Sequence, residues 1–264
     1  MVTYESESDL RRSLPGLVAV SERLEAPLIV VDNASPDGTG RLLREWSGRS
    51  GRLEVLELTD NFGYAVAANR AFAAAGDRDV LLLNPDVELP GPDPVEALEL
   101  ALAERPEAGI VAPRLLDSRG AVQPTARRLA SLPAMLGSLE ASRLVRPLRA
   151  VYERYLAPSH SEERIHVGWV IGAAMLVRRR AFEEVGGFDE GFFLYMEDAD
   201  LCRRLNRAGW DVDYIPDVRL RHGYARASSV PGANLLVSQA RRRHYASLAR
   251  YWRRHPRALL GGER

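Results

Sequence analysis

The fold class of this chain is decided by residues 28–39, LIVVDNASPDGT. The apolar, β-branched first half predicts a buried strand, and the second half is a turn that contains residues able to cap a helix. Leu42, Leu43 and Trp46 then recur at helical spacing, which predicts a helix with one apolar side. A strand, a turn and a helix in this order form the repeating unit of α/β proteins.

The same unit recurs along most of the chain. Apolar runs that predict strands occupy Leu28 to Val31, Leu53 to Leu58, Val80 to Leu83, Gly109 to Ala112, Ala173 to Val177 and Val212 to Ile215. Helical stretches separate several of them, so we expect a Rossmann-like, mostly parallel central sheet with helices on both faces. Residues 1–4, MVTY, are typical of the end of a first strand, shortened from the usual length of about five or six residues.

Composition excludes several classes of protein. Of the 264 residues, 46% are hydrophobic, which is enough for the core of one large α/β domain or two small ones and too many for a disordered chain. The single cysteine, Cys202, excludes a disulfide framework and a thiolate metal cluster. The chain has no lysine, which excludes Schiff-base chemistry and a phosphate-loop lysine. No apolar run approaches the roughly 20 residues that span a bilayer, and we expect a cytoplasmic protein without a secretion signal.

The charges are unevenly distributed, although 36 basic and 36 acidic residues cancel. From Arg219 onward there are 11 Arg and one acid, Glu263, a local charge of about +10, so the preceding residues carry about −10. Within residues 229–264, apolar side chains recur at helical spacing among these arginines: Tyr245, Leu248, Ala249 and Trp252. This pattern predicts a basic amphipathic helical tail of the kind that binds a membrane surface or a partner.

The middle of the chain is less regular than the rest. Residues 116–163 are rich in proline and arginine and lack the alternation of strand and helix patterns. We therefore expect an insertion or a mobile lid in this segment.

Three acidic clusters follow predicted strands or open predicted helices, where α/β sheets place their ligands. Asp32 could accept hydrogen bonds from a base or a ribose, and Asp86, in the sequence NPD, suits a magnesium or manganese ion that bridges a diphosphate. Glu197, Asp198 and Asp200 follow an aromatic run and include a candidate general base. Taken alone, the first two clusters are better explained as ordinary turns, whereas three acids exceed what a helix cap requires.

Three other side chains each allow a structural and a functional interpretation. His222 could bind a metal or a phosphate, although a lone histidine is more often structural. Trp169 could belong to the core or stack on a sugar ring. Cys202 lies near Leu201 and Leu205 on a predicted helix, which indicates buried packing rather than reactivity.

Taken in chain order, these motifs resemble those of family-2 glycosyltransferases with the GT-A fold, above all the rhamnosyltransferase-like branch that builds bacterial cell-surface glycans. The matching segments are residues 2–4, 29–39, 61–65 with Asn69, 82–86, 172–177, 186–190, 193–201 and His222. The resemblance covers about residues 2–228, so we expect a GT-A domain at residues 1–228, followed by the basic tail at 229–264. One departure is Glu5, because the family usually has Asn or Asp after Thr-Tyr.

The resemblance implies a role for each matching residue. Thr3, Tyr4 and Asp32 would surround the nucleoside of an NDP-sugar. The other residues on the donor side would be Asn61, Gly63, Asn69 and Asn84.

The resemblance also implies the metal and the catalytic groups. Asp86 would bind Mg²⁺ or Mn²⁺, and His222 would help to hold the metal or the diphosphate. Asp198 would be the catalytic base, with Glu197 orienting it or the acceptor, and Trp169 would line the acceptor side. The reaction would be an inverting transfer from an NDP-sugar, with dTDP-rhamnose favoured, to a hydroxyl of a glycan or a polyprenyl-diphosphate-linked acceptor. It would serve polysaccharide synthesis at the inner face of the cell membrane, where the basic tail would meet anionic lipid.

Two alternatives belong to other classes. A nucleotide-sugar or glycan-binding protein of the same fold that has lost turnover would explain the short first strand, whereas Asp86 and Asp198 argue against it. A nucleic-acid binder could use the arginine-rich tail, but the acidic body makes nucleic acid an improbable partner.

Overall fold

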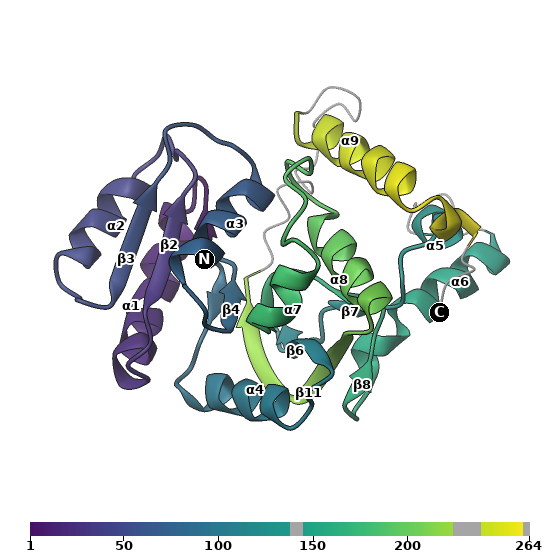
Figure 1. The fold of residues 1–264 in the computed structure, drawn as a ribbon, viewed down its shortest axis with the longest axis horizontal. Coiled ribbons are helices and arrows are strands. Elements are labelled where there is room, and N and C mark those ends of the chain that lie inside the picture. Colours follow the sequence, from purple (N-terminus) through teal and green to yellow (C-terminus); the bar gives the residue numbers. More distant parts are fainter. Residues whose placement is uncertain (138–144, 224–238, 261–264) are drawn as a thin grey trace.

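The computed structural model describes residues 1–137, 145–223 and 239–260 of the chain. Its described strands form a three-stranded sheet, a six-stranded sheet and a two-stranded ribbon, with helices packed against them. Figure 1 shows the smaller N-terminal sheet beside the larger one. The predicted α/β class is confirmed.

The N-terminal sheet is parallel, with strand order β1-β2-β3. Its strands are β1 (Val2–Thr3), β2 (Leu28–Asp32) and β3 (Leu53–Glu57), and its helices are α1 (Glu7–Arg23), α2 (Thr39–Ser47) and α3 (Tyr64–Ala74). Successive side chains of a strand face opposite sides: Val30 packs in the cluster that contains the leucines of α1 and α2, and Val31 packs with the alanines of α3. Helices therefore cover both faces, and β1 is as short as expected.

The larger sheet is mixed, which corrects the expectation of a mostly parallel one. Its order is β4 (Val80–Leu83), β10 (Ala174–Val177), β6 (Ala108–Leu116), β11 (Asp211–His222) and β5 (Val87–Glu88), with β8 (Ile165–His166) also paired to β11. Among the described strands of this sheet, only β6 and β11 run parallel; β10 is antiparallel to both neighbours, and β5 is antiparallel to β11. Strand direction depends on which distant segments pair, and hydrophobic patterns within a segment do not report this.

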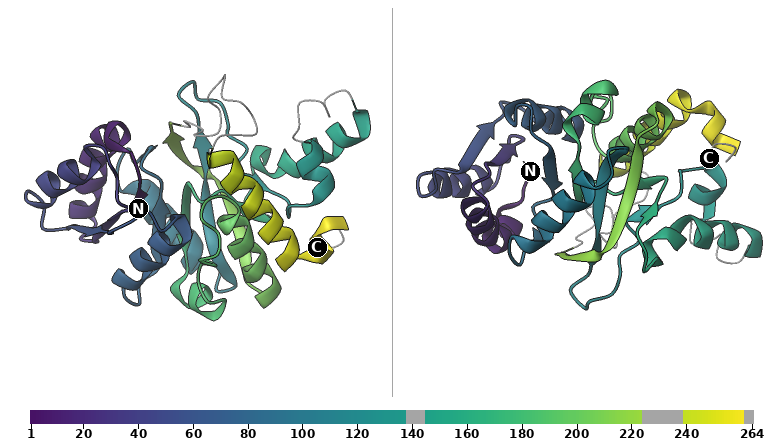
Figure 2. Two further views of the ribbon diagram at one scale, coloured as in Figure 1. Left: turned by 90° about the horizontal axis from the view of Figure 1, so that it is seen from above. Right: turned by 60° about the horizontal axis from the view of Figure 1, so that its bottom comes forward.

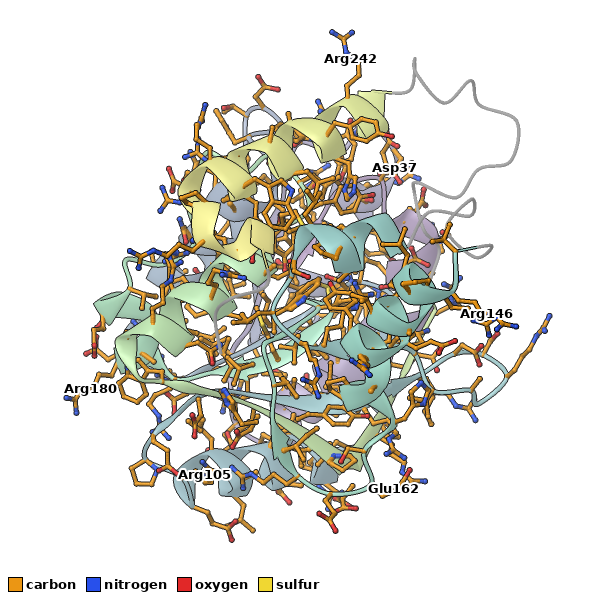
Figure 3. The ribbon with its side chains drawn as sticks, turned by 90° about the vertical axis from the view of Figure 1, so that its right-hand side faces the viewer. Asp37, Arg105, Arg146, Glu162, Arg180 and Arg242 are labelled. Carbon is orange, nitrogen blue, oxygen red and sulfur yellow. The ribbon has the colours of Figure 1, made fainter. Side chains whose placement is uncertain are left out.

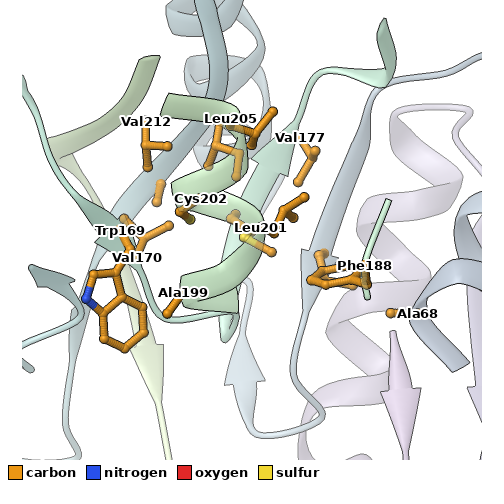
Figure 4. Packing of buried hydrophobic residues seen from close by; sticks show 14 of the residues in the cluster. Ala68, Trp169, Val170, Val177, Phe188, Ala199, Leu201, Cys202, Leu205 and Val212 are labelled. Carbon is orange, nitrogen blue, oxygen red and sulfur yellow. The ribbon is translucent and has the colours of Figure 1, made fainter. Parts of the chain in front are cut away.

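Several helices pack against the larger sheet, two of them through neighbouring residues of β6. Helix α4 (Asp93–Ala103) packs on Val111 in one buried hydrophobic cluster. Helix α8 (Glu197–Ala208) packs on Ile110 in a second buried hydrophobic cluster. The second cluster also includes Val31 of the smaller sheet, so one core connects the two sheets. Cys202 is fully buried in it, as Figure 4 shows, and burial raises the pKa of its thiol to about 12, in agreement with a packing role.

The segment at residues 116–163 contributes to this core. It contains β7 (Ala126–Arg127), α5 (Leu132–Gly137), α6 (Arg146–Leu156) and the 3-10 turn Ala157–His160. Strand β7 pairs antiparallel with β9 (Trp169–Val170), and Tyr155 of α6 is buried in the cluster that contains Cys202. A lid function stays a prediction, and residues 138–144 lie outside the described part.

The C-terminal helix α9 (Gln239–Arg254) packs on the body alongside α8, as the views of Figure 2 show, and is followed by the 3-10 turn Pro256–Leu260. Its most buried side chains are Ser247 and Tyr251, whereas Tyr245 is 59% exposed. The buried face is thus rotated from the stripe expected from the sequence. A short helix, α7 (Arg179–Glu184), follows β10 in the chain.

Candidate active site

The end of β2 carries the first acidic cluster. Asp32 is buried, and its Oδ1 accepts hydrogen bonds from the backbone N (3.2 Å) and the Oγ (2.5 Å) of Ser35. Thr3 pairs with Asp32 in register and donates its hydroxyl to the carbonyl O of Val31 at 3.3 Å, whereas Tyr4 is half exposed. The three expected nucleoside-binding residues are therefore neighbours, and their contact with a nucleoside stays a prediction.

Asn33, which was not among the expected site residues, holds the next loop in place. Its Nδ2 donates to Asn61 Oδ1 (3.0 Å) and to the carbonyl O of Gly63 (3.2 Å), and its Oδ1 accepts from the backbone N of Phe62. Gly63 has φ 89° and ψ 168°, and a Cβ there would lie 2.6 Å from the carbonyl O of Phe193. Asn61 and Gly63 thus connect the N-terminal sheet to the segment that leads into α8.

Asn69 has a structural role. Its Oδ1 accepts from the backbone N of Phe188, and its Nδ2 donates to the carbonyl O of Phe188 and to Glu190 Oε1, each at 3.0 Å. Both N–H groups of this amide are therefore used within the protein. Contact of Asn69 with the donor, which the resemblance implied, stays a prediction.

Asp86 and His222 lie together, although 135 residues separate them in the sequence. His222 Nε2 lies 3.2 Å from Asp86 Oδ1, and both side chains are largely buried. The contact follows from the antiparallel pairing of β5 with β11, in which His222 is the partner of Val87. Asn84 begins the loop between β4 and β5 that contains Asp86, and its backbone N donates to the carbonyl O of Ala173 at 2.8 Å.

The third member of this group, Gln123, comes from the segment that we expected to be an insertion. Gln123 Nε2 donates to the carbonyl O of His222 at 3.0 Å. This hydrogen bond orients the Gln123 amide so that its Oε1 lies 2.7 Å from His222 Nδ1. Nδ1 must then carry the proton, so in the neutral ring Nε2 is an acceptor that faces the Asp86 carboxylate. With the imidazole neutral and oriented by the amide, its Nε2 and the Asp86 carboxylate could together bind a divalent cation.

A second group with metal-ligand residue types lies at the opposite end of β11. It consists of His166, Asp211 and Asp213. Arg105 approaches Asp211 to 2.6 Å and Arg164 approaches Asp213 to 3.1 Å, so guanidinium groups already balance these carboxylates. The metal role expected of Asp86 and His222 stays a prediction.

Glu197 and Asp198 open α8 and differ in their surroundings. Asp198 Oδ2 accepts from the backbone N of Gly172 (3.0 Å) and Oδ1 from that of Ala199 (2.8 Å), whereas the buried Glu197 Oε2 has no hydrogen-bond partner within the described ranges. Burial raises the pKa of both groups; repulsion by Asp198 raises that of Glu197 further, whereas the N–H donors and the Arg127 charge restrain that of Asp198. Of the two acids, Asp198 is therefore the one whose ionised form the surrounding N–H donors and the Arg127 charge stabilise.

The loop before these acids is strained. Tyr195 and Met196 have φ values of 70° and 69°, in the left-handed region that non-glycine residues avoid. Such residues cost about 1–3 kcal/mol each and persist only where the surroundings hold them. The holding contacts come from Tyr64, whose backbone N donates to the carbonyl O of Phe193 at 2.7 Å, and from Ser247 of α9, whose Oγ donates to that of Leu194 at 2.8 Å.

Asp200, the third acid of the cluster, serves packing rather than chemistry. It is fully buried and accepts from Arg204 Nε (2.7 Å) and from His255 Nε2 (2.8 Å). Because Arg207 donates to His255 Nδ1, the proton of the neutral imidazole lies on Nε2 and points at Asp200. The last part of the chain is thereby joined to the helix that carries Asp198.

Trp169, expected on the acceptor side, is buried on β9. Its partner across the ribbon is Arg127, whose Cζ lies 5.0 Å from the indole centroid. The chain then reaches Gly172, which binds Asp198. Trp169 therefore lies close in sequence and in space to the proposed base, and its contact with an acceptor stays a prediction.

Comparison with known proteins agrees with this arrangement. The model of glycosyl transferase family 2 matches residues 1–186, and that of glycosyl transferase family group 2 matches residues 155–261. The N-acetylglucosaminyl-diphospho-decaprenol L-rhamnosyltransferase of Mycobacterium tuberculosis is 35% identical over 254 residues, covering 90% of this chain and 79% of that protein. Rhamnosyltransferase WbbL of Escherichia coli is 26% identical over 256 residues, covering 95% and 90%.

Solved structures show the same fold. A mannosyltransferase from Pyrobaculum calidifontis, in complex with GDP-Man and Mn²⁺, superposes with a TM-score of 0.58 at 21% identity, over 86% of this chain and 56% of that one. Among the described residues, no helix has the length and apolar character needed to cross a bilayer. The chain has the GT-A fold and belongs to glycosyltransferase family 2, in the branch that includes the rhamnosyltransferases.

Proposed function

We propose that this glycosyltransferase moves a sugar from an NDP-sugar to a hydroxyl group of a glycan or lipid-linked acceptor, with inversion at the anomeric carbon. Asp198 acts as the general base, and Asp86 and His222 hold the divalent ion at the diphosphate of the donor. The alternative, a binding protein without turnover, lacks support because both sets of residues are complete.

One observation carries the proposal: residues 172 and 173 connect the two sets. The backbone N of Gly172 binds Asp198 Oδ2, and the carbonyl O of Ala173 accepts from the backbone N of Asn84, in the loop of Asp86. A base and a diphosphate site on either side of one backbone segment match a displacement in which the acceptor attacks opposite the leaving group.

The roles of the two acids follow from their protonation. Burial raises the pKa of Asp198, so its ionised form is a stronger base than an exposed carboxylate. Asp198 removes the proton of the acceptor hydroxyl, which attacks the anomeric carbon while the nucleoside diphosphate leaves. Glu197 stays neutral and can donate a hydrogen bond to the acceptor, since its Oε2 has no other partner in the part of the chain described.

A divalent ion fits the donor set formed by Asp86 and His222. Gln123 holds the imidazole in the tautomer in which Nδ1 carries the proton and Nε2 is an acceptor. When bound, Mg²⁺ or Mn²⁺ offsets the charge that develops on the leaving diphosphate. The mannosyltransferase of the same fold was solved with Mn²⁺, which supports this choice.

For the substrates we propose dTDP-rhamnose as donor and a polyprenyl-diphosphate-linked sugar as acceptor. Support comes from the relatives, one of which is named for rhamnosyl transfer to N-acetylglucosaminyl-diphospho-decaprenol. Other nucleotide sugars are competing donors. A thermal-shift panel of NDP-sugars with Mn²⁺ tests the choice, because a ligand that binds only the folded state raises the melting temperature.

The catalytic assignment is tested by nucleotide release in the presence of an acceptor. We expect Asp198→Asn and Asp86→Ala to lose at least a hundredfold in kcat/KM while circular dichroism stays unchanged. Asp217→Asn, an exposed acid of β11, is the control and should retain activity. Normal turnover by Asp198→Asn would show that another group is the base. If the unmodified protein released no nucleotide from any donor in the panel, the binding-protein alternative would replace the proposal.

We also propose that α9 contacts an anionic membrane surface. Arg242 extends from α9 into solvent in Figure 3, whereas Arg180 lies at a distant corner. Each arginine near such a surface contributes about 1 kcal/mol, so Arg242→Glu should weaken binding to anionic vesicles about tenfold or more. Arg180→Glu is the control, and equal losses in both variants would count against contact through α9.

A further inference from the structure

A second group of polar side chains lies near Asp198, and the proposed mechanism gives these side chains no common ligand. It consists of Arg127, Tyr155 and Trp169. Arg127 and Trp169 are cross-strand partners in the β7–β9 ribbon, and Tyr155 comes from α6. The Cζ of Arg127 lies 5.0 Å from the Trp169 ring centroid and 5.7 Å from that of Tyr155, and the two rings are 6.5 Å apart.

Two of these side chains hold buried hydrogen-bond donors that are not used. Tyr155 is 3% exposed and Trp169 is 5% exposed. Within the described ranges, neither the Tyr155 hydroxyl nor the Trp169 Nε1 has a hydrogen-bond partner. Buried polar groups in native proteins are rarely left unpaired, so two in contact indicate an absent ligand or ordered water.

Arg127 supplies the positive charge of this group. Burial raises the pKa of the Tyr155 phenol, whereas the charge of Arg127 lowers it. Arg127 donates its Nε to the carbonyl O of Pro124 at 2.8 Å and forms no ion pair in the part of the chain that the structure describes.

The chemistry of this cluster is complementary to an anion. A guanidinium and an indole N–H can only donate, and the phenol is free to donate as well. A neutral sugar hydroxyl needs no cation, whereas a phosphate oxygen accepts several strong, charge-assisted hydrogen bonds. The diphosphate of the donor already has the Asp86–His222 site, so the anion at this cluster must come from another substrate.

We propose that Arg127, Tyr155 and Trp169 bind a phosphate group of the acceptor and thereby place its sugar hydroxyl at Asp198. This inference rests on the proposed function, because it assumes a phosphate-linked acceptor. The cluster thus selects acceptors that carry a diphosphate over free glycans. It also explains why a segment outside the core motifs of the fold, residues 116–163, packs against the catalytic helix.

The first test is anion binding, which needs no turnover. Inorganic pyrophosphate is titrated by calorimetry into the Asp86→Ala protein with EDTA, so that the donor site is disabled. Adding Arg127→Gln, Tyr155→Phe or Trp169→Phe should weaken binding at least fivefold, whereas Arg128→Gln, an exposed neighbour, should not. Absence of pyrophosphate binding, or equal affinity in all variants, would overturn the proposal.

The second test separates this proposal from the proposed function. Acceptor KM is compared for an alkyl diphosphate of N-acetylglucosamine and for the alkyl glycoside without phosphate. We expect Tyr155→Phe to raise KM about tenfold for the first acceptor only, with the donor KM unchanged. An equal rise for both acceptors would refute phosphate recognition while leaving glycosyl transfer intact. If the unmodified enzyme fails with both but the pyrophosphate result holds, the proposed function is wrong and the anion site stands.

Discussion

Replacing Gly63 by alanine probes the link between the donor-side loop and the catalytic helix. Gly63 has φ 89° and ψ 168°, a region that is almost restricted to glycine. An added Cβ would meet the carbonyl O of Phe193 at 2.6 Å and its Cα at 2.9 Å. The variant must therefore shift the loop or break the hydrogen bond from Tyr64 N to that carbonyl, 2.7 Å long.

The expected cost follows from these two terms. A non-glycine residue in this backbone region costs about 1–3 kcal/mol, and the lost hydrogen bond adds about 1 kcal/mol. Gly63→Ala should thus lower the free energy of unfolding by about 2–4 kcal/mol, a fall in Tm of about 5–15 °C for a domain of this size. Because Phe193 leads directly into Glu197 and Asp198, we also expect kcat to fall at least tenfold.

Gly209→Ala is the matched control. Gly209 also has a positive φ, 90°, but its ψ of 10° is in the left-handed helical region and an added Cβ would meet nothing within 4 Å. Gly209→Ala therefore reports the cost of a positive φ without a steric contact. Urea denaturation measures the free energy of unfolding, and a coupled nucleotide-release assay measures kcat. If Gly63→Ala were no more destabilising than Gly209→Ala and kept its kcat, the loop would not position the base.

Three further outcomes are expected. Gln123→Leu should leave His222 Nδ1 without its acceptor and weaken metal affinity by about 10–100-fold, measured by Mn²⁺ titration. The raised pKa of Asp198 means that activity falls as pH drops through a value above the usual range for aspartate; Arg127→Gln should move this limb to still higher pH. Burial raises the pKa of Asp200, but the hydrogen bonds and charges of His255 and Arg204 together outweigh burial, so the pKa of Asp200 is lowered overall. The ionised Asp200 therefore stabilises the fold above the unfolded pKa of about 3.9, and this contribution is lost as pH falls through the folded pKa. The difference in urea midpoint between the unmodified protein and Asp200→Asn should shrink over that acidic range.

The sequence predicted the local elements well because their signals are local. The strand at 28–32, the turn and the helix beginning at Thr39 all follow from adjacent residues. The acidic cluster at 197–200 was recognised, but its division of labour was not, because only the structure shows His255 on Asp200 and Gly172 on Asp198. Gln123, Arg127 and Tyr155 were missed since their segment carries no regular pattern.

The tail was only partly predictable. Arginines at helical spacing indicated a surface helix, and the structure contains α9. However, Tyr251 is fully buried and accepts a hydrogen bond from Arg203 Nε at 2.7 Å, and Arg203 itself is almost fully buried. Deletion of α9 would uncover this buried arginine, so point changes at its exposed arginines test membrane contact more cleanly than truncation.

The mixed direction of the larger sheet, the feature that sequence patterns did not reveal, is what assembles the site. Because β10 is antiparallel to β4, it starts where β4 ends, and Gly172 and Ala173 therefore lie beside Asn84. Because β5 is antiparallel to β11, the end of β11 brings His222 to Asp86. A fully parallel sheet would place the start of β10 at the opposite end of the strands, away from Asp86 and His222. The two antiparallel pairings thus bring the proposed base and the proposed diphosphate site to the same end of the strands, as a single displacement requires.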